Sequence, residues 1–157
     1  MNIIHKRKLL KTSLKETLVL LDNSFEALSY SYDKCRAIGE KSGYDLEEQE
    51  SFEALTSRFA RTADILTQKA FKTLFAILQE NVKTIIDAAN LSEKLGIVET
   101  ADDILNIREL RNQIAHEYIN ADLTTLFMDV LHYVPEMKIA IDNFKMYVNK
   151  ELGKLSE

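Results

Sequence analysis

The spacing of apolar residues constrains the fold of this chain more than any other feature of its sequence. Apolar side chains recur every three or four positions, which is the repeat that keeps them on one face of an α-helix. The longest such run consists of Leu123, Leu126, Val130, Val134, Met137, Ile141, Phe144, Val148 and Leu152. The chain also has only four glycines and one proline among 157 residues, too few for the turns of a sheet protein of this size. These observations predict an all-α fold.

The same spacing divides the chain into five predicted helices. They cover residues 6–32, 46–80, 82–96, 100–118 and 123–152. Asp45 is suited to cap the second helix, and Gly96 to end the third in a left-handed conformation. Pro135 should kink or divide the last helix near His132, because proline donates no backbone hydrogen bond. With no repeat or linker, we predict one domain over residues 1–157, an up-and-down bundle of four to five helices.

Charge and cysteine content bear on the cellular setting. The 20 basic and 25 acidic residues give a net charge of −5, which argues against broad nonspecific binding to duplexes but not against a local basic cleft. The single cysteine, Cys35, fits a reducing compartment. The first residues include no apolar stretch of signal-peptide length, and no run approaches the roughly 20 apolar residues of a membrane span. We therefore expect a soluble cytoplasmic protein that does not enter a membrane.

The stretch 100–118 contains an unusual cluster of polar side chains. At about 100° per residue, its apolar arc consists of Ile104, Ile107, Leu110, Ile114, Ala115 and Tyr118. Arg111 falls inside this arc, where a guanidinium is destabilising unless a partner pairs with it. Asn112 and His116 lie one turn apart on the adjoining flank, and Arg108 lies between that flank and the arc. A cation, an amide, an imidazole and a phenol thus gather in the last turns of one helix.

This cluster suits chemistry on a phosphate ester. His116 can accept and return a proton near neutral pH, and Arg111 can bind phosphate oxygens and stabilise developing charge. Together they suffice for attack of a ribose 2′-OH on the neighbouring phosphate. Because RNA cleavage without a metal works best with a base and an acid, we expect a symmetric dimer that brings two histidines together. The alternative is structural, with Arg111 buried and His116 favoured by the helix dipole.

Motifs for cofactors are missing from the sequence. There is no Gly-rich phosphate loop, no dinucleotide fingerprint and no His-Glu-x-x-His pattern, and three histidines with one cysteine leave little for a transition metal. We expect neither a metal nor a cofactor.

Two further segments each allow two interpretations. In SRFARTAD, Arg61 and Asp64 are three residues apart and can form an ordinary ion pair on the helix surface. Alternatively, Asp64 or a neighbour orients a residue of the Arg111 cluster. Residues 5–11 make the start of the first helix basic, which is either a solvated helix end or a contribution to a phosphate-binding surface.

Residues 111–118, RNQIAHEY, resemble the signature of HEPN-domain ribonucleases. The likeness is closest to the HepT toxin group, in which arginine, four residues, histidine, one residue and tyrosine follow in order. The polar residue after the arginine, Asn112, also fits. The specific match covers residues 107–118, with looser similarity at 57–64 and 91–99, and the all-helical prediction agrees over most of the chain.

The resemblance implies a homodimeric HEPN-like bundle with metal-independent endoribonuclease activity on RNA. It implies that Arg111 positions the phosphate, that His116 transfers protons and that Asn112 supports the site; we place Arg108 beside it as a second supporting residue. It also implies a partner, an MntA-type nucleotidyltransferase antitoxin, which in that family transfers AMP to the motif tyrosine, here Tyr118. A phosphate there would block RNA and engage the arginine.

Two other functions fit the same sequence. HEPN-like bundles also resemble the non-catalytic partners of small nucleotidyltransferases, which would bind the transferase or a nucleotide and leave RNA intact. The third interpretation is a plain structural helical dimer with a buried polar network. In that case Arg111→Ala would cause a large loss of stability, because a buried partner is orphaned, with no activity to lose.

Overall fold

The described part of the chain consists of helices and their connections. The computed structural model describes residues 2–116 and 123–153, and in these ranges it has no strand. Its elements are α1 (Ile3–Ile38), α2 (Leu46–Asp64), the π-helical segment η1 (Ile65–Ala70), α3 (Phe71–Ile77), α4 (Ile85–Lys94), α5 (Ala101–His116) and α6 (Leu123–Leu152). Because α2, η1 and α3 follow one another without a break, the described residues form five helical rods. The prediction of an all-α helical bundle is confirmed.

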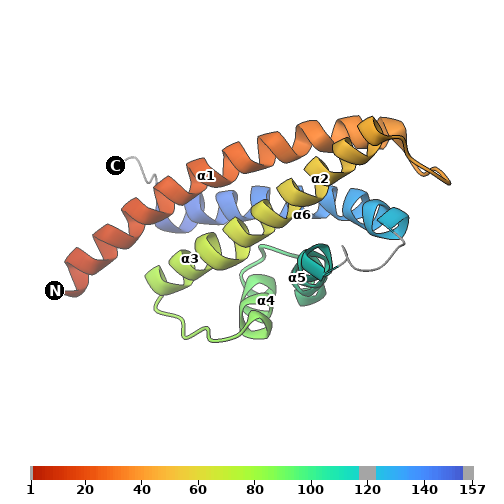
Figure 1. Cartoon of the computed structure of the whole chain (residues 1–157). Coiled ribbons are helices and arrows are strands. Elements are labelled where there is room, and N and C mark those ends of the chain that lie inside the picture. Colours follow the sequence, from red (N-terminus) through yellow and green to blue (C-terminus); the bar gives the residue numbers. More distant parts are fainter. Residues whose placement is uncertain (1, 117–122, 154–157) are drawn as a thin grey trace.

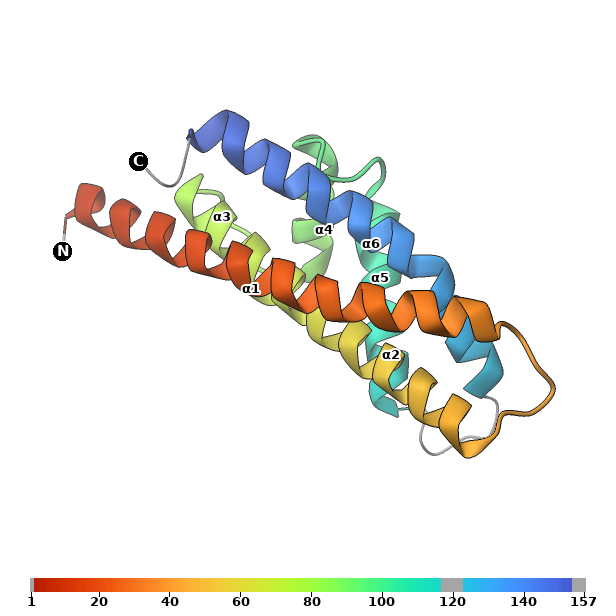
Figure 2. The same ribbon diagram turned by 90° about the horizontal axis from the view of Figure 1, so that it is seen from above.

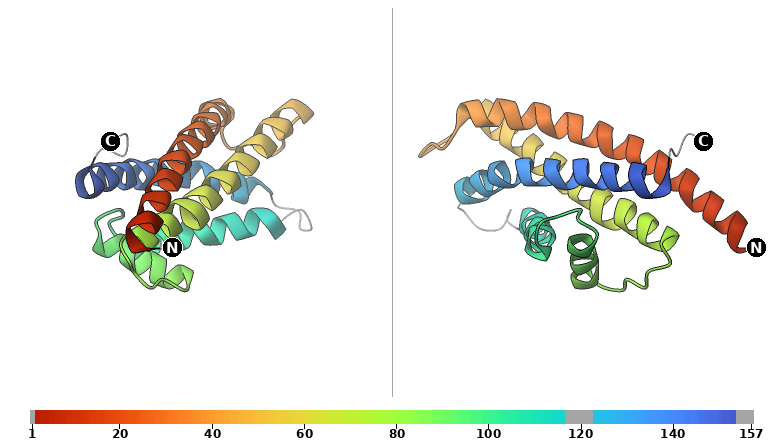
Figure 3. Two further views of the ribbon diagram at one scale, coloured as in Figure 1. Left: turned by 90° about the vertical axis from the view of Figure 1, so that its left-hand side faces the viewer. Right: turned by 180° about the vertical axis from the view of Figure 1, so that it is seen from behind.

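Three long rods run along the bundle and two shorter helices cross them. The α1 helix and the α2–η1–α3 rod form an antiparallel hairpin, and α6 packs against both (Figure 1). Seen from above, α5 crosses beneath α2 and α6 (Figure 2). The two side views show the same crossing, with α4 packed beside α5 (Figure 3). The up-and-down order therefore holds for the long rods, whereas α4 and α5 lie crosswise.

Short polar caps set several helix boundaries. Asp45 caps α2 in a reciprocal capping box, as predicted. Gly96 follows α4 with a φ of +78°, the left-handed conformation expected at a helix end. The third helix begins at Ile85 rather than at residue 82, because the Thr84 side chain accepts a hydrogen bond at the N-cap. The first helix exceeds its predicted range of 6–32 at both ends.

Of the two outcomes predicted at Pro135, a kink or a division of the last helix, the division does not occur. The α6 helix continues through Pro135 as one element from Leu123 to Leu152. Pro135 is exposed, while Val134 and Met137 on either side of it are buried. Packing of this apolar stripe outweighs the one backbone hydrogen bond that proline removes.

The π-helical segment η1 changes the phase of the second rod directly after Asp64. In an α-helix, residues five positions apart point about 140° away from each other. A π-helix closes its hydrogen bonds over five residues instead, so such residues return to the same side. Asp64 and Lys69 are one such pair, and both line the same surface groove. The groove lining therefore continues from the end of α2 onto η1.

Aromatic side chains tie the long rods together. The rings of Phe52 on α2 and Phe127 on α6 stack with centroids 4.6 Å apart, and Phe71 lies 5.7 Å from Phe144. Buried side chains of α5, among them Ile104, Ile107 and Leu110, belong to the same core, which therefore reaches from the long rods to the crossing helix. Among the described residues, none of the helices combines the length and apolar content of a membrane span.

Candidate functional site, a basic groove beside Arg111

Asp64 holds two arginines from α5. Arg111 donates to both of its carboxylate oxygens, from Nε to Oδ1 at 2.8 Å and from Nη2 to Oδ2 at 3.0 Å. Arg108 donates from Nη1 to Oδ1 at 3.2 Å. A guanidinium on the apolar side of a helix is stable when a carboxylate meets it with two parallel hydrogen bonds. This pairing accounts for the position of Arg111 and joins the end of α2 to α5.

The environment keeps Arg111 charged and reachable. Its hydrogen bonds to Asp64 raise the pKa of the guanidinium, against a smaller lowering by burial. The Arg111 side chain is 27% exposed, so it is neither dry nor free in solvent. In the single chain Arg111 is thus partly buried and paired, and the structural alternative stays a prediction beside the catalytic one.

The two arginines form one wall of a basic groove. The groove has a volume of about 600 Å³. It is lined by Ala60, Arg61, Asp64, Ile65, Gln68, Lys69, Arg108 and Arg111. Four cationic side chains face one carboxylate, although the chain as a whole carries a net charge of −5. Such a local excess of positive charge attracts anions such as phosphates.

The SRFARTAD segment divides into structural and groove-lining residues. Asp64 pairs with α5 rather than with Arg61, as in the second of the two interpretations. Arg61 is exposed and lines the groove. Arg58 instead donates to the Ala27 carbonyl and to Ser31 Oγ, at 3.1 and 2.8 Å, and fastens α2 to α1.

The remaining predicted residues lie outside the groove lining. Asn112 and His116 are exposed on the outer flank of α5, and Ala115, expected on the apolar arc, is exposed as well. Within the described ranges no hydrogen bond or ion pair joins His116 to Arg111. Tyr118 lies outside the described residues, so its place beside Arg111 stays a prediction. One chain therefore brings Arg108 and Arg111 together with Asp64 and leaves His116 open to solvent.

Two residues that line the groove, Gln68 and Lys69, were not predicted from the sequence. Gln68 follows Asp64 by four residues and Lys69 follows Ile65 by four, the spacing that keeps side chains on one face of a helix, so both extend the groove along η1. The signal that could have identified Lys69 is its spacing of four residues from Ile65 and eight from Arg61, which places all three on one helix face.

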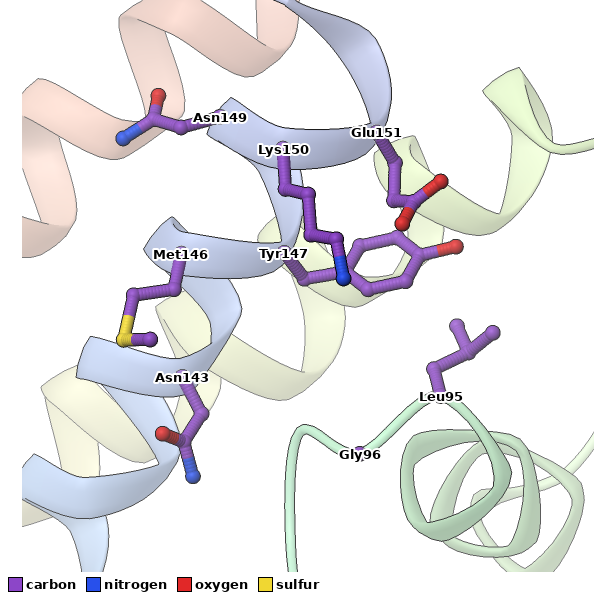
Figure 4. Close-up of a pocket in the computed structure, with 8 residues that line it drawn as sticks. All are labelled: Leu95, Gly96, Asn143, Met146, Tyr147, Asn149, Lys150 and Glu151. Carbon is purple, nitrogen blue, oxygen red and sulfur yellow. The ribbon is translucent and has the colours of Figure 1, made fainter.

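A second hollow lies where the end of α6 meets the connection after α4 (Figure 4). Its volume is about 580 Å³. It is lined by Leu95, Gly96, Asn143, Met146, Tyr147, Asn149, Lys150 and Glu151. Burial, helped by Glu151 and Glu80, raises the pKa of Tyr147. One lysine and one glutamate give this hollow no net charge, so it does not attract anions as the groove does.

Neither a metal site nor a similar protein helps to assign a function to this chain. Within residues 2–116 and 123–153 no group of three His, Cys, Asp or Glu side chains is placed to hold a metal ion. Comparison with protein-family models, with curated proteins and with solved structures gave no match. The all-α bundle and its basic groove define the class of site, and the function has to be argued from that groove.

Proposed function

We propose that this chain is a metal-independent endoribonuclease that acts as a homodimer in the cytoplasm. The observation that carries the proposal is the Arg111 guanidinium, which Asp64 fixes at the edge of a basic groove and which shares a helix with an exposed His116. The resemblance of residues 111–118 to the HepT signature and the helical bundle support it.

The reaction that we propose is attack of a ribose 2′-oxygen on the adjacent phosphorus. His116 removes the 2′-OH proton as the new O–P bond forms. Arg111 stabilises the negative charge that develops on the phosphate oxygens. His116 of the second copy protonates the 5′-oxygen as its bond to phosphorus breaks, because one chain supplies only one imidazole. The products are a 2′,3′-cyclic phosphate and a 5′-hydroxyl.

Asp64 and Arg108 act through the position of Arg111. A guanidinium has five N–H donors, and Asp64 accepts from Nε and from one hydrogen of Nη2. The donors on Nη1 and the second hydrogen of Nη2 remain for a phosphate. Arg108 shares the same carboxylate and adds positive charge, and Asn112 lies one turn before His116 on the flank.

The proposed regulator is an MntA-type nucleotidyltransferase antitoxin that transfers AMP to Tyr118. The resemblance supports this partner, and electrostatics gives it a physical reason. A phosphodiester on Tyr118, seven residues after Arg111 in the sequence, would bring negative charge and bulk to the site that RNA has to occupy. The modified chain would then be inactive as a toxin.

The proposal is tested by incubating the purified protein with single-stranded RNA in EDTA. We expect cleavage with cyclic or 3′-phosphate ends, and His116→Ala should abolish it while the fold is unchanged by circular dichroism. His132→Ala is the matched control, because His132 is an exposed histidine on α6, away from the groove. Cleavage that survives His116→Ala, that requires a divalent ion, or that comes from a strict monomer would overturn the proposal.

A second candidate is a non-catalytic module that binds a nucleotide or a nucleotidyltransferase. One observation favours it, since His116 and Arg111 are not joined within the described residues of one chain, whereas the basic groove alone suffices for phosphate binding. This module would bind ATP or the transferase and leave RNA intact. Growth arrest on expression without a transferase, lost in Arg111→Ala, separates the toxin from this module.

A further inference from the structure

We propose that the RNA strand leaves the reaction centre over η1, with its phosphates on Arg61 and Lys69 and the ribose of a flanking nucleotide in a second polar hollow on α1. This inference rests on the proposed function and adds the path and the kind of recognition. It makes Arg61, Lys69 and Thr73 positioning residues for a substrate whose reacting phosphate lies at Arg111.

The path follows from two hollows that share a wall. Beyond the basic groove lies a hollow of about 440 Å³. Its lining consists of Ser13, Glu16, Thr17, Leu20, Gln68, Lys69 and Thr73. Gln68 and Lys69 also line the groove of Arg111. A polar surface therefore continues from α5, across η1, to the side of α1.

The first part of this path suits phosphates. Arg61 and Lys69 are exposed, and no ion pair holds either of them within the described residues. Arg108 and Arg111 are already drawn to Asp64. The two unpaired cations are therefore the ones most available to neutralise the backbone on leaving the reaction centre.

The second part suits sugars better than phosphates. Thr73 donates its hydroxyl hydrogen to the Lys69 carbonyl at 2.8 Å, which leaves the oxygen lone pairs as acceptors. The Glu16 carboxylate is likewise an acceptor and repels phosphate. A ribose 2′-OH is a donor that can satisfy such groups, and a deoxyribose offers none. An acidic protein segment would meet Arg61 and Lys69 but would be repelled by Glu16.

The residues that line the two hollows also indicate how the protein would contact the bases of the RNA. No aromatic side chain lines either hollow among the described residues, so bases find no stacking platform of the kind that single-strand binding proteins use. Contacts to phosphate and sugar position a strand without reading its sequence. We therefore expect binding that tolerates sequence, depends strongly on salt and prefers RNA to DNA.

The experiment measures dissociation constants of single-stranded RNA and of the matching DNA by fluorescence anisotropy over a range of NaCl concentrations. The background is His116→Ala, so that RNA stays intact. Arg61→Gln and Lys69→Gln should each reduce the slope of log affinity against log salt by about 0.7, for RNA and DNA alike. Thr73→Val should lower the RNA preference by roughly two- to tenfold, the value of one hydrogen bond, and leave DNA affinity unchanged.

Matched controls and parallel cleavage assays separate the two proposals. Lys150→Gln alters a lysine in the hollow at the end of α6. Thr12→Val removes a threonine that bonds a carbonyl one turn back on α1, as Thr73 does on α3; both should behave like the parent. Suppose that protein with His116 intact cleaves the RNA, while Arg61→Gln and Lys69→Gln keep the parental salt slope. The proposed RNA path is then wrong, and the proposed nuclease activity is supported. If the slopes fall but unmodified protein leaves RNA intact, the path stands and the nuclease is wrong.

Discussion

The groove beside Arg111 and the hollow at the end of α6 have almost the same volume, about 600 and 580 Å³, but their linings differ. The groove gathers four cationic side chains around one carboxylate, whereas the α6 hollow holds one lysine and one glutamate among apolar and amide groups. Size therefore does not distinguish the two regions. Concentrated positive charge does, because it attracts anions.

The two regions also differ in how their polar groups are held. In the groove, Arg111 is fixed from another helix by two hydrogen bonds and still faces solvent. In the α6 hollow, the Asn143 amide donates to the Ile97 carbonyl at 3.1 Å and so serves the fold. Preorganised donors with spare hydrogens are what catalysis on a phosphate needs. The groove provides them, whereas in the α6 hollow the Asn143 amide is held by the connection after α4.

Among these variants, Arg111→Gln is expected to have the largest effect on the rate of RNA cleavage. Loss of one preorganised charge-stabilising group lowers a rate by about 10² to 10³, so RNA cleavage should fall by that factor. Lys150→Gln, which removes the cation of the α6 hollow, should leave the rate unchanged. Initial rates in EDTA check both. Equal losses in the two variants would contradict the distinction between the regions.

A smaller effect on the cleavage rate is expected from Asp64→Asn. This change preserves the shape of the side chain but weakens its hydrogen bonds to Arg111. Misplacement of a catalytic group lowers rates by up to about 10², and the loss should appear in kcat more than in KM. Stability should fall by no more than about 1 kcal/mol, because Asp64 is 38% exposed and solvent screens the pair.

A double-mutant cycle sharpens this prediction. If Asp64 acts through Arg111, adding Asp64→Asn to Arg111→Gln should lower the cleavage rate little further. Fully additive losses would show that Asp64 has a separate role.

The smallest expected effect is on the stability of the fold at alkaline pH, through Tyr147 in the α6 hollow. Burial raises the pKa of Tyr147 in the folded state, whereas the unfolded phenol titrates near its usual pKa of about 10. The folded chain holds this proton more tightly, so the contribution to stability is complete below about pH 10 and is lost as the pH rises through the higher folded value. Urea unfolding of Tyr147→Phe should show a weaker decline of stability above pH 10. An identical decline would place the alkaline loss elsewhere.

Much of the fold could be read from single residues and their spacing. The apolar repeats predicted all five helical rods, and Asp45 and Gly96 predicted two of their boundaries because caps act within a few residues. The position of Arg111 on an apolar arc predicted that an anionic side chain would pair with it. Dimerisation, the nuclease reaction and the place of Tyr118 stay predictions.

By itself, then, the sequence determined the helices, their buried faces and the demand of Arg111 for an anion, since each of these depends on neighbours a few positions away. Only the tertiary structure decided that Asp64, 47 residues earlier in the chain, meets that demand in place of pairing with Arg61. It also decided that Gln68 and Lys69 line the same groove as Arg111 and that α6 stays whole at Pro135. The physical reason is that these outcomes depend on how one helix packs against another, which no local repeat records.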